Sequence, residues 1–156
     1  MSVSQHAANA ITNAAGWTTA SPDEHGVFHF HLEEGLDMDF FCPDGRMGIL
    51  RSTLEPLPDA DQEAEHLIRR YAQHAVAVCK KRKSILSLES GHVQLHRTFR
   101  LDTLTKEEIS LTVPRMARDF LNDLAWWRTA LGRHQHHKSS SPFSLSEVAL
   151  NWSLGR

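Results

Sequence analysis

Residues Gly26–Leu54, GVFHFHLEEGLDMDFFCPDGRMGILRSTL, decide the fold of this chain. Hydrophobic side chains alternate with other side chains along three short runs, and alternation with a period of two residues is typical of strands. Two turn signals, Glu34–Gly35 and Pro43–Gly45, separate the runs. The stretch therefore predicts a three-stranded antiparallel meander. The meander contains no group in a catalytic arrangement, which favours a sheet that binds a ligand over one that catalyses a reaction.

Helices are predicted on both sides of the meander. Val3–Ala15 has an alanine-rich stripe at helical spacing, and Gly16 is suited to end the helix. A second helix is expected from an N-cap at Asp59 or Asp61 to about Lys81. Thr105–Glu108 has the form of a capping box that opens a short helical turn. Pro114 is expected to interrupt or restart that turn, and the third helix is predicted over Pro114–Leu131.

A β-hairpin is predicted between the second and third helices. Ser84–Glu89 and His92–Leu101 flank Ser90–Gly91, and the second run has the clearest alternation in the chain. The expected fold class is α+β, in the order helix, three-stranded antiparallel meander, helix, β-hairpin, helix. We expect one α/β domain over residues 1–132, followed by a polar linker and C-terminal tail over 133–156.

Composition excludes several classes of protein. The chain has 156 residues, 40% hydrophobic and 23% charged, which fits one globular domain with a sizeable core. A net charge of −2 gives no electrostatic reason to expect nucleic acid. The N-terminus lacks the pattern of a signal peptide, and no run is apolar for the roughly 18 residues that cross a bilayer. We therefore expect a cytoplasmic protein without membrane contact, with Cys42 and Cys79 as free thiols.

Catalytic and metal chemistry find little support in the sequence. His29 and His31 are two residues apart on one strand face, but a metal site needs further ligands that no motif supplies. Asp37 and Asp39 form a pair on a polar face, which is typical of a solvated edge. There is no nucleophile motif and no glycine-rich phosphate loop. We therefore predict a protein that is not an enzyme, with no catalytic residues, no metal and no cofactor.

The order of elements, together with the quoted meander, resembles the class I type III secretion chaperones, the Tir-chaperone family of Gram-negative bacteria. The likeness covers roughly residues 3–131. Its patterns are GVFHFHLEEGLDMDFF, MGILRSTLEPLP, DQEAEHLIRRYAQHAVAV, SILSLESGHVQLHRTFRL and DFLNDLAWWRTAL. The resemblance implies a cytoplasmic homodimer without ATPase activity. Such a protein would bind the N-terminal segment of a secreted effector and keep it extended. It would deliver the effector to the secretion apparatus, with the secretion ATPase as a further partner.

Mapped onto this chain, the resemblance nominates two surfaces. The effector-binding residues are expected on the first helix and one face of the meander, namely Ala7, Ile11, Ala14, Val27, His29, Phe41 and Leu50. If the other face is the free one, the meander residues become Phe28, Phe30, Met38 and Ile49. The dimer interface is expected on the second helix or the hairpin, at Leu67, Tyr71, Ala75, Val78, Leu95 and Phe99.

Two other functions remain open at this point. A regulatory partner-switch protein of the same fold would sequester an anti-activator, and it would bind this resident cytosolic regulator in competition with an effector. A small metal- or ligand-binding protein would use the histidines, and His29→Ala with His31→Ala would then abolish zinc binding. The sequence does not name an effector.

Overall fold

The computed structural model describes residues 1–32 and 36–132 of the chain. Three helices and five strands follow one another in these bounds: α1 Val3–Ala15, β1 Phe28–His31, β2 Asp37–Phe41, β3 Met47–Pro56, α2 Asp61–Val78, β4 Ile85–Glu89, β5 His92–Arg100 and α3 Lys106–Gly132. The predicted α+β order is confirmed. The predicted turn at Glu34–Gly35 and the predicted linker and tail over 133–156 lie outside the described residues.

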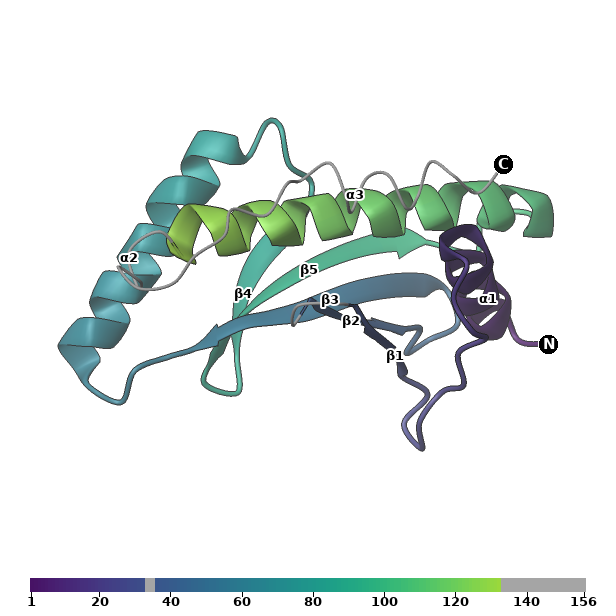
Figure 1. The fold of residues 1–156 in the computed structure, drawn as a ribbon, viewed down its shortest axis with the longest axis horizontal. Helices are drawn as coiled ribbons and strands as arrows, with labels where there is room; N and C mark the ends of the chain where they lie inside the picture. Colours follow the sequence, from purple (N-terminus) through teal and green to yellow (C-terminus); the bar gives the residue numbers. More distant parts are fainter. Residues whose placement is uncertain (33–35, 133–156) are drawn as a thin grey trace.

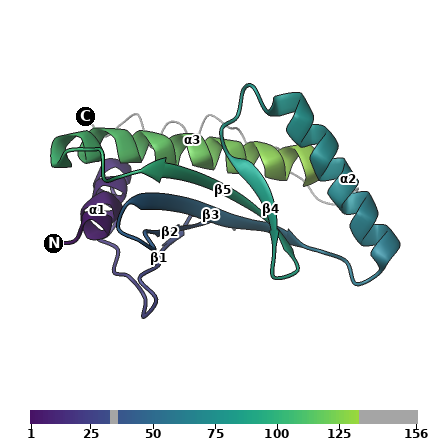
Figure 2. The ribbon, with the colours of Figure 1, turned by 180° about the vertical axis from the view of Figure 1, so that it is seen from behind.

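The five strands form one antiparallel sheet in the order β1-β2-β3-β5-β4. The long helix α3 runs along one face of this sheet, with α1 beside it at one end and α2 at the other (Figure 1). The view from behind shows the same arrangement (Figure 2). The opposite face of the sheet is covered by neither α1 nor α3, so the molecule has a helical side and an uncovered side.

The turn between β2 and β3 fixes which side chains face the helices. Asp44 accepts hydrogen bonds from the backbone N–H groups of Arg46 and Met47, each at 2.9 Å, and Gly45 has a φ of +69°. A short polar side chain that bonds the backbone ahead of it is typical of a tight turn. With this turn length Phe41 pairs with Ile49 and Phe40 pairs with Leu50. Leu50 therefore lies on the helical side and Ile49 on the uncovered side.

The hydrophobic core lies between the sheet and the two helices on its face. Aromatic and aliphatic side chains from every second residue of the strands meet α1 and α3 there. Phe40 packs between Phe28 and Phe99, with ring centroids 6.0 and 6.3 Å away. Val93, Leu95 and Phe99 of β5 point into this core and are buried.

Helix α3 differs from the prediction because it is continuous through Pro114. The capping box is confirmed: Thr105 N–H donates to Glu108 at 2.8 Å, and Glu108 N–H donates to the Thr105 hydroxyl at 3.2 Å. The helix then runs without a break from Lys106, with Pro114 buried inside it. Its apolar face continues on both sides of the proline, and this packing outweighs the lost backbone hydrogen bond. The predicted start at Pro114 was therefore wrong.

Helix α2 also differs from the prediction at its ends. Its N-cap is Ala60, which has no side chain to bond the first turn, so neither Asp59 nor Asp61 caps it. The helix ends at Val78, before the basic run that was expected to close it. Tyr71 is its only fully buried residue. By contrast α1 matches its prediction, and Gly16 ends it with a φ of +70°.

Candidate functional site

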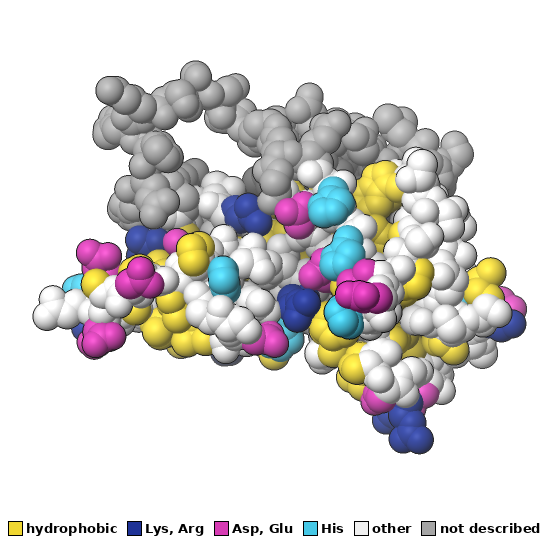
Figure 3. Space-filling model, turned by 90° about the horizontal axis from the view of Figure 1, so that it is seen from below, with side chains coloured by type: hydrophobic (Ala, Val, Ile, Leu, Met, Phe, Trp, Pro, Cys, Tyr) yellow, Lys and Arg dark blue, Asp and Glu magenta, His cyan; other side chains and the backbone are white. Residues whose placement is uncertain are grey.

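The uncovered face of the sheet carries a band of ionisable side chains that crosses four strands. The strand register aligns His29 of β1, Asp39 of β2, Arg51 of β3 and His96 of β5. Hydrophobic, acidic, basic and histidine side chains are interspersed on this side of the molecule (Figure 3). The register thus brings apolar and ionisable side chains together on one accessible face.

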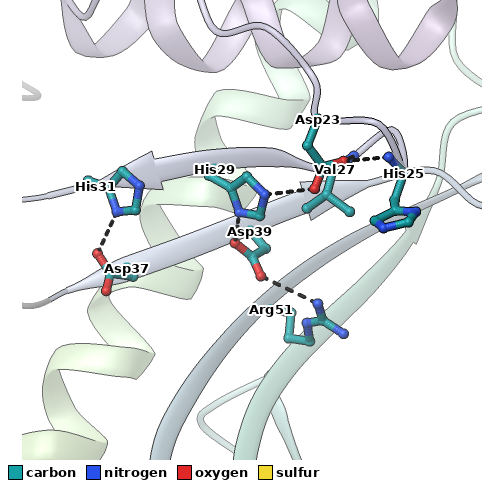
Figure 4. A network of polar contacts seen from close by, with 8 residues as sticks. All are labelled: Asp23, His25, Val27, His29, His31, Asp37, Asp39 and Arg51. Atoms are coloured by element: carbon teal, nitrogen blue, oxygen red, sulfur yellow. Dashed lines mark hydrogen bonds and ion pairs between the residues drawn. The ribbon is translucent and has the colours of Figure 1, made fainter.

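His29 is the centre of the band (Figure 4). Its Nδ1 lies 2.7 Å from an oxygen of Asp39, and its Nε2 lies 3.0 Å from an oxygen of Asp23. Hydrogen bonds with Asp23 and then Asp39 raise the pKa of His29 above its ordinary value, although the small burial of the ring opposes this. The histidine thereby connects the loop before β1 to β2.

Asp23 organises the loop that leads into β1. Its carboxylate accepts from the backbone N–H groups of Val27 at 2.8 Å and His25 at 2.9 Å. These bonds and the contact with His29 lower the pKa of Asp23 to about 2, with the Val27 N–H as the largest cause. The carboxylate is therefore ionised throughout the physiological range.

Arg51 connects the band of ionisable side chains to two apolar side chains, Phe41 and Ile49. Its guanidinium lies 3.4 Å from Asp39 and 4.9 Å from the ring centre of Phe41, a cation–π distance. The register places Phe41 opposite Ile49 of β3. Both are half-buried, so part of each side chain remains available to a ligand. The uncovered face thus offers apolar contacts directly beside fixed charges.

The predicted effector-binding residues divide into two groups. Ala14 and His29 are exposed, and Val27 and Phe41 are half-buried, so these four are accessible. The other three are fully buried in the core, namely Ala7, Ile11 and Leu50. The alanine-rich stripe of α1 is used in packing against α3, since these two helices have an extensive mutual contact.

The structure also shows on which side of the sheet the residues of the alternative effector-binding face lie. Phe28, Phe30 and Met38 all lie on the covered side and are buried. Ile49 lies on the uncovered side with Phe41. Sequence reasoning did not nominate Arg51. The signal that could have placed Ile49 is the length of the turn at Pro43–Arg46, which sets the pairing between β2 and β3.

A second accessible surface lies between α2 and β4. A groove of about 220 Å³ is lined by Ile68, Tyr71, Ala72, Ala75, Leu86, Ser87, Leu88 and Val93. Val76 is 76% exposed and Leu88 is 52% exposed, although both are large and hydrophobic. Large hydrophobic side chains exposed together on α2 and β4 are typical of a surface that another polypeptide covers.

The residues predicted for a dimer interface are placed in different environments. Leu67, Ala75 and Val78 are half-buried on α2 and remain partly accessible. Tyr71, Leu95 and Phe99 are buried within the chain itself. The exposed large hydrophobic residues of α2 and β4 are Ile68, Val76, Ile85 and Leu88, and none of them was nominated for the dimer interface. Ile68 and Val76 belong to the wide apolar stripe of α2, and a wide stripe can serve two surfaces.

Within residues 1–32 and 36–132 no group of three or more His, Cys, Asp or Glu side chains is arranged to hold a metal ion. Burial raises the pKa of the Cys42 thiol to about 11, so it is protonated and a poor nucleophile at neutral pH. Cys79 is an exposed free thiol. No helix in the described part of the chain is long and apolar enough to cross a membrane.

Comparison with known proteins agrees with this geometry. The model of the Tir chaperone protein (CesT) family matches residues 9–119. The fold is similar to a chain in the structure of the HopA1-SchA chaperone–effector complex, with a TM-score of 0.60 and 17% identity, covering 81% of this chain and 94% of that one. It is also similar to a chain of the ExsC-ExsE complex, with a TM-score of 0.56 and 15% identity, covering 84% and 97%. No curated protein has significant sequence similarity to the chain.

Proposed function

Because the chain belongs to the Tir chaperone protein (CesT) family, we propose that it is a type III secretion chaperone. It binds the N-terminal segment of a secreted effector, keeps that segment extended and delivers it to the secretion apparatus. The observation that carries this proposal is the uncovered face of the sheet, where half-buried Phe41 and Ile49 lie beside a charged band. The similar fold in a chaperone–effector complex supports the same conclusion.

The effector segment is proposed to lie along β1 and over the accessible part of the meander. β1 is an edge strand, so its outer backbone groups are available to a ligand in extended conformation. Backbone pairing at an edge gives affinity, and side-chain pockets on alternate positions give specificity. Val27, His29 and Phe41 would then contact effector side chains, with Ala14 at the margin. Ala7, Ile11 and Leu50 would act only by holding α1 and β3 in place.

The working form is proposed to be a homodimer, which is typical of the family. The groove between α2 and β4 is the surface we assign to the second copy, because α2 buries little within its own chain. Leu67, Ala75 and Val78 would take part with the exposed Ile68 and Val76. Contact of a helical face with an identical face buries apolar surface on both copies at once.

The family and fold are those of secretion chaperones that are not enzymes. We propose that the protein works in the bacterial cytoplasm, where effectors are synthesised, and that the secretion ATPase is a further partner. Binding alone accounts for this activity, since an extended effector segment is maintained by contact with the chaperone surface.

The experiment that tests the function is capture of the partner from native cytosol. The tagged full-length chain is purified under secretion-inducing conditions, and the eluted species are identified by mass spectrometry and sized by light scattering. We expect two copies of the chain to hold one protein that the type III apparatus exports. An N-terminal fragment of that protein should bind alone, and export should fail when the chaperone gene is deleted.

Substitutions then test which residues form the effector-binding surface. Phe41→Asp should abolish capture of the effector fragment, whereas Leu111→Asp, at an exposed apolar position on α3, should leave it unchanged. A chain that is monomeric and captures no exported protein would overturn the proposal. Recovery of a resident regulator in place of an exported protein would favour the partner-switch function instead.

A further inference from the structure

A polar pocket lies on the helical side of the molecule, away from the uncovered face of the sheet. It has a volume of about 280 Å³ and is lined by Lys81, Lys83, Arg97, Asp119, Asn122 and Asp123. These residues come from the loop after α2, from β5 and from the middle of α3. Three cationic side chains from two separate segments thus converge on one cavity.

Arg97 is the buried member of this group. It is only 9% exposed, because its stem lies on the covered face of β5 opposite Leu50. In the described part of the chain its only ion-pair partner is Asp119, whose oxygen lies 3.7 Å from Nη1, beyond hydrogen-bond distance. Among the described residues no acceptor hydrogen-bonds to Arg97. A guanidinium has five donors, and those of Arg97 are not fully enclosed, so they open into the pocket, where a ligand oxygen can accept from them.

The other acidic residue of the pocket is already neutralised. Asp123 accepts from Arg82 at 2.8 Å and from the Ser84 hydroxyl and backbone N–H at 2.6 and 3.2 Å. It therefore has little capacity left for Arg97. Lys81 and Lys83 are exposed at the margin of the pocket and add positive charge. The half-exposed Asp119 is the one remaining carboxylate, so positive charge is in excess.

We propose that this pocket binds an oxyanion, either a carboxylate or a phosphate, with Arg97 as the buried ligand and the two lysines at its margin. Arginine recognises the planar edge of such groups through parallel hydrogen bonds, and lysines add charge without strict geometry. A water molecule takes about 30 Å³, so the cavity has ample room for either group. The proposal is independent of the effector surface, which lies on the other side of the sheet.

The test uses the full-length chain and two probes. Inorganic phosphate and N-acetylglutamate are titrated separately while the Arg97 Nε–Hε signal is followed by NMR at constant ionic strength. We expect a saturable shift with at least one probe. Lys81→Ala combined with Lys83→Ala should weaken binding about tenfold, because two charge-assisted contacts are lost. Asp119→Asn should strengthen binding, because a competing carboxylate is removed.

The control is Lys80→Ala, which removes a neighbouring exposed cation that does not line the pocket. It should leave both affinities unchanged. Tighter binding of phosphate would identify a free phosphate as the ligand, whereas equal or tighter binding of N-acetylglutamate would identify an acidic side chain of a polypeptide. No saturable shift with either probe would overturn the proposal. A shift that the double lysine variant and Asp119→Asn leave unchanged would overturn it equally.

Discussion

His29 on β1 lies directly opposite Asp39 on β2, and its Nδ1 is 2.7 Å from the Asp39 carboxylate. Its other ring nitrogen lies 3.0 Å from Asp23 (Figure 4). A carboxylate can only accept a hydrogen bond, so both ring nitrogens must donate. The contacts therefore describe the doubly protonated imidazolium, which links the loop before β1 to the sheet.

This relationship predicts a pH-dependent contribution to stability. The pKa of His29 is raised in the folded chain, so its contribution is complete below the ordinary pKa of 6.5 and is lost as the pH rises through the raised pKa. His29→Gln should therefore lower the free energy of unfolding at pH 6 by about 0.5 kcal/mol, since the ring is largely exposed, and have less effect at pH 8.5. Urea unfolding at both pH values measures this difference. An equal loss of unfolding free energy at pH 6 and pH 8.5 would contradict the prediction.

Gly48 is predicted to be intolerant of any side chain. A Cβ atom there would lie 2.7 Å from Cε2 of Phe99, whose ring stacks on Phe40. Gly48→Ala should cost about 1–3 kcal/mol of stability through overpacking. Adding Phe99→Leu should recover part of the loss, so that the double variant is more stable than the sum of the single effects predicts. Additive losses in chemical denaturation would show that the two sites do not clash.

Asp123 is predicted to fix the loop after α2. Its buried carboxylate accepts hydrogen bonds from Arg82 and from Ser84. Asp123→Asn should destabilise the fold by about 2 kcal/mol, because an amide cannot accept all of these bonds and places donors against the arginine. Glu107→Gln, an exposed carboxylate on the same helix, is the control and should change stability by less than about 0.5 kcal/mol. Thermal unfolding of the two variants side by side decides this.

Tyr71 offers a direct optical measurement, because it is the only tyrosine in the chain. Burial, followed by its 2.7 Å hydrogen bond to Glu55, raises the pKa of this phenol above its ordinary value of 10. Absorbance of tyrosinate should therefore be absent in the native protein at pH 10.5 and present in urea. Glu55→Gln should lower the pKa in the native state. Normal ionisation of the folded chain near pH 10 would show that α2 is not held as described.

The proposed dimer predicts that charge on α2 separates the two copies. Val76 is 76% exposed on this helix, and Val76→Asp should weaken association by about 2 kcal/mol or more because it places a charge within the proposed interface. Leu111→Asp is a matched control, since Leu111 is 72% exposed but lies on α3. Light scattering over a range of concentrations measures both. Unchanged association of the Val76→Asp variant would show that α2 is not part of the dimer interface.

The sequence by itself determined the type and order of the helices and strands, and which of their side chains are apolar. The Thr105–Glu108 capping box, Gly16 as the end of α1 and the alternation of the hairpin all act through contacts within a few residues. Such signals do not depend on the rest of the fold. The resemblance to secretion chaperones rested on the same local patterns, and family membership confirmed it.

Only the tertiary structure decided which apolar residues remain available. Ile11 and Leu50 have the same local pattern as accessible residues, but packing of α1 on α3 and the register of β2 with β3 bury them. Continuation of α3 through Pro114 likewise depends on an apolar face that packs along the whole sheet. The convergence of Arg97 with Lys81 and Lys83 joins segments that are distant in the chain. Burial and charge at such sites are set by long-range contacts, and no local pattern encodes them.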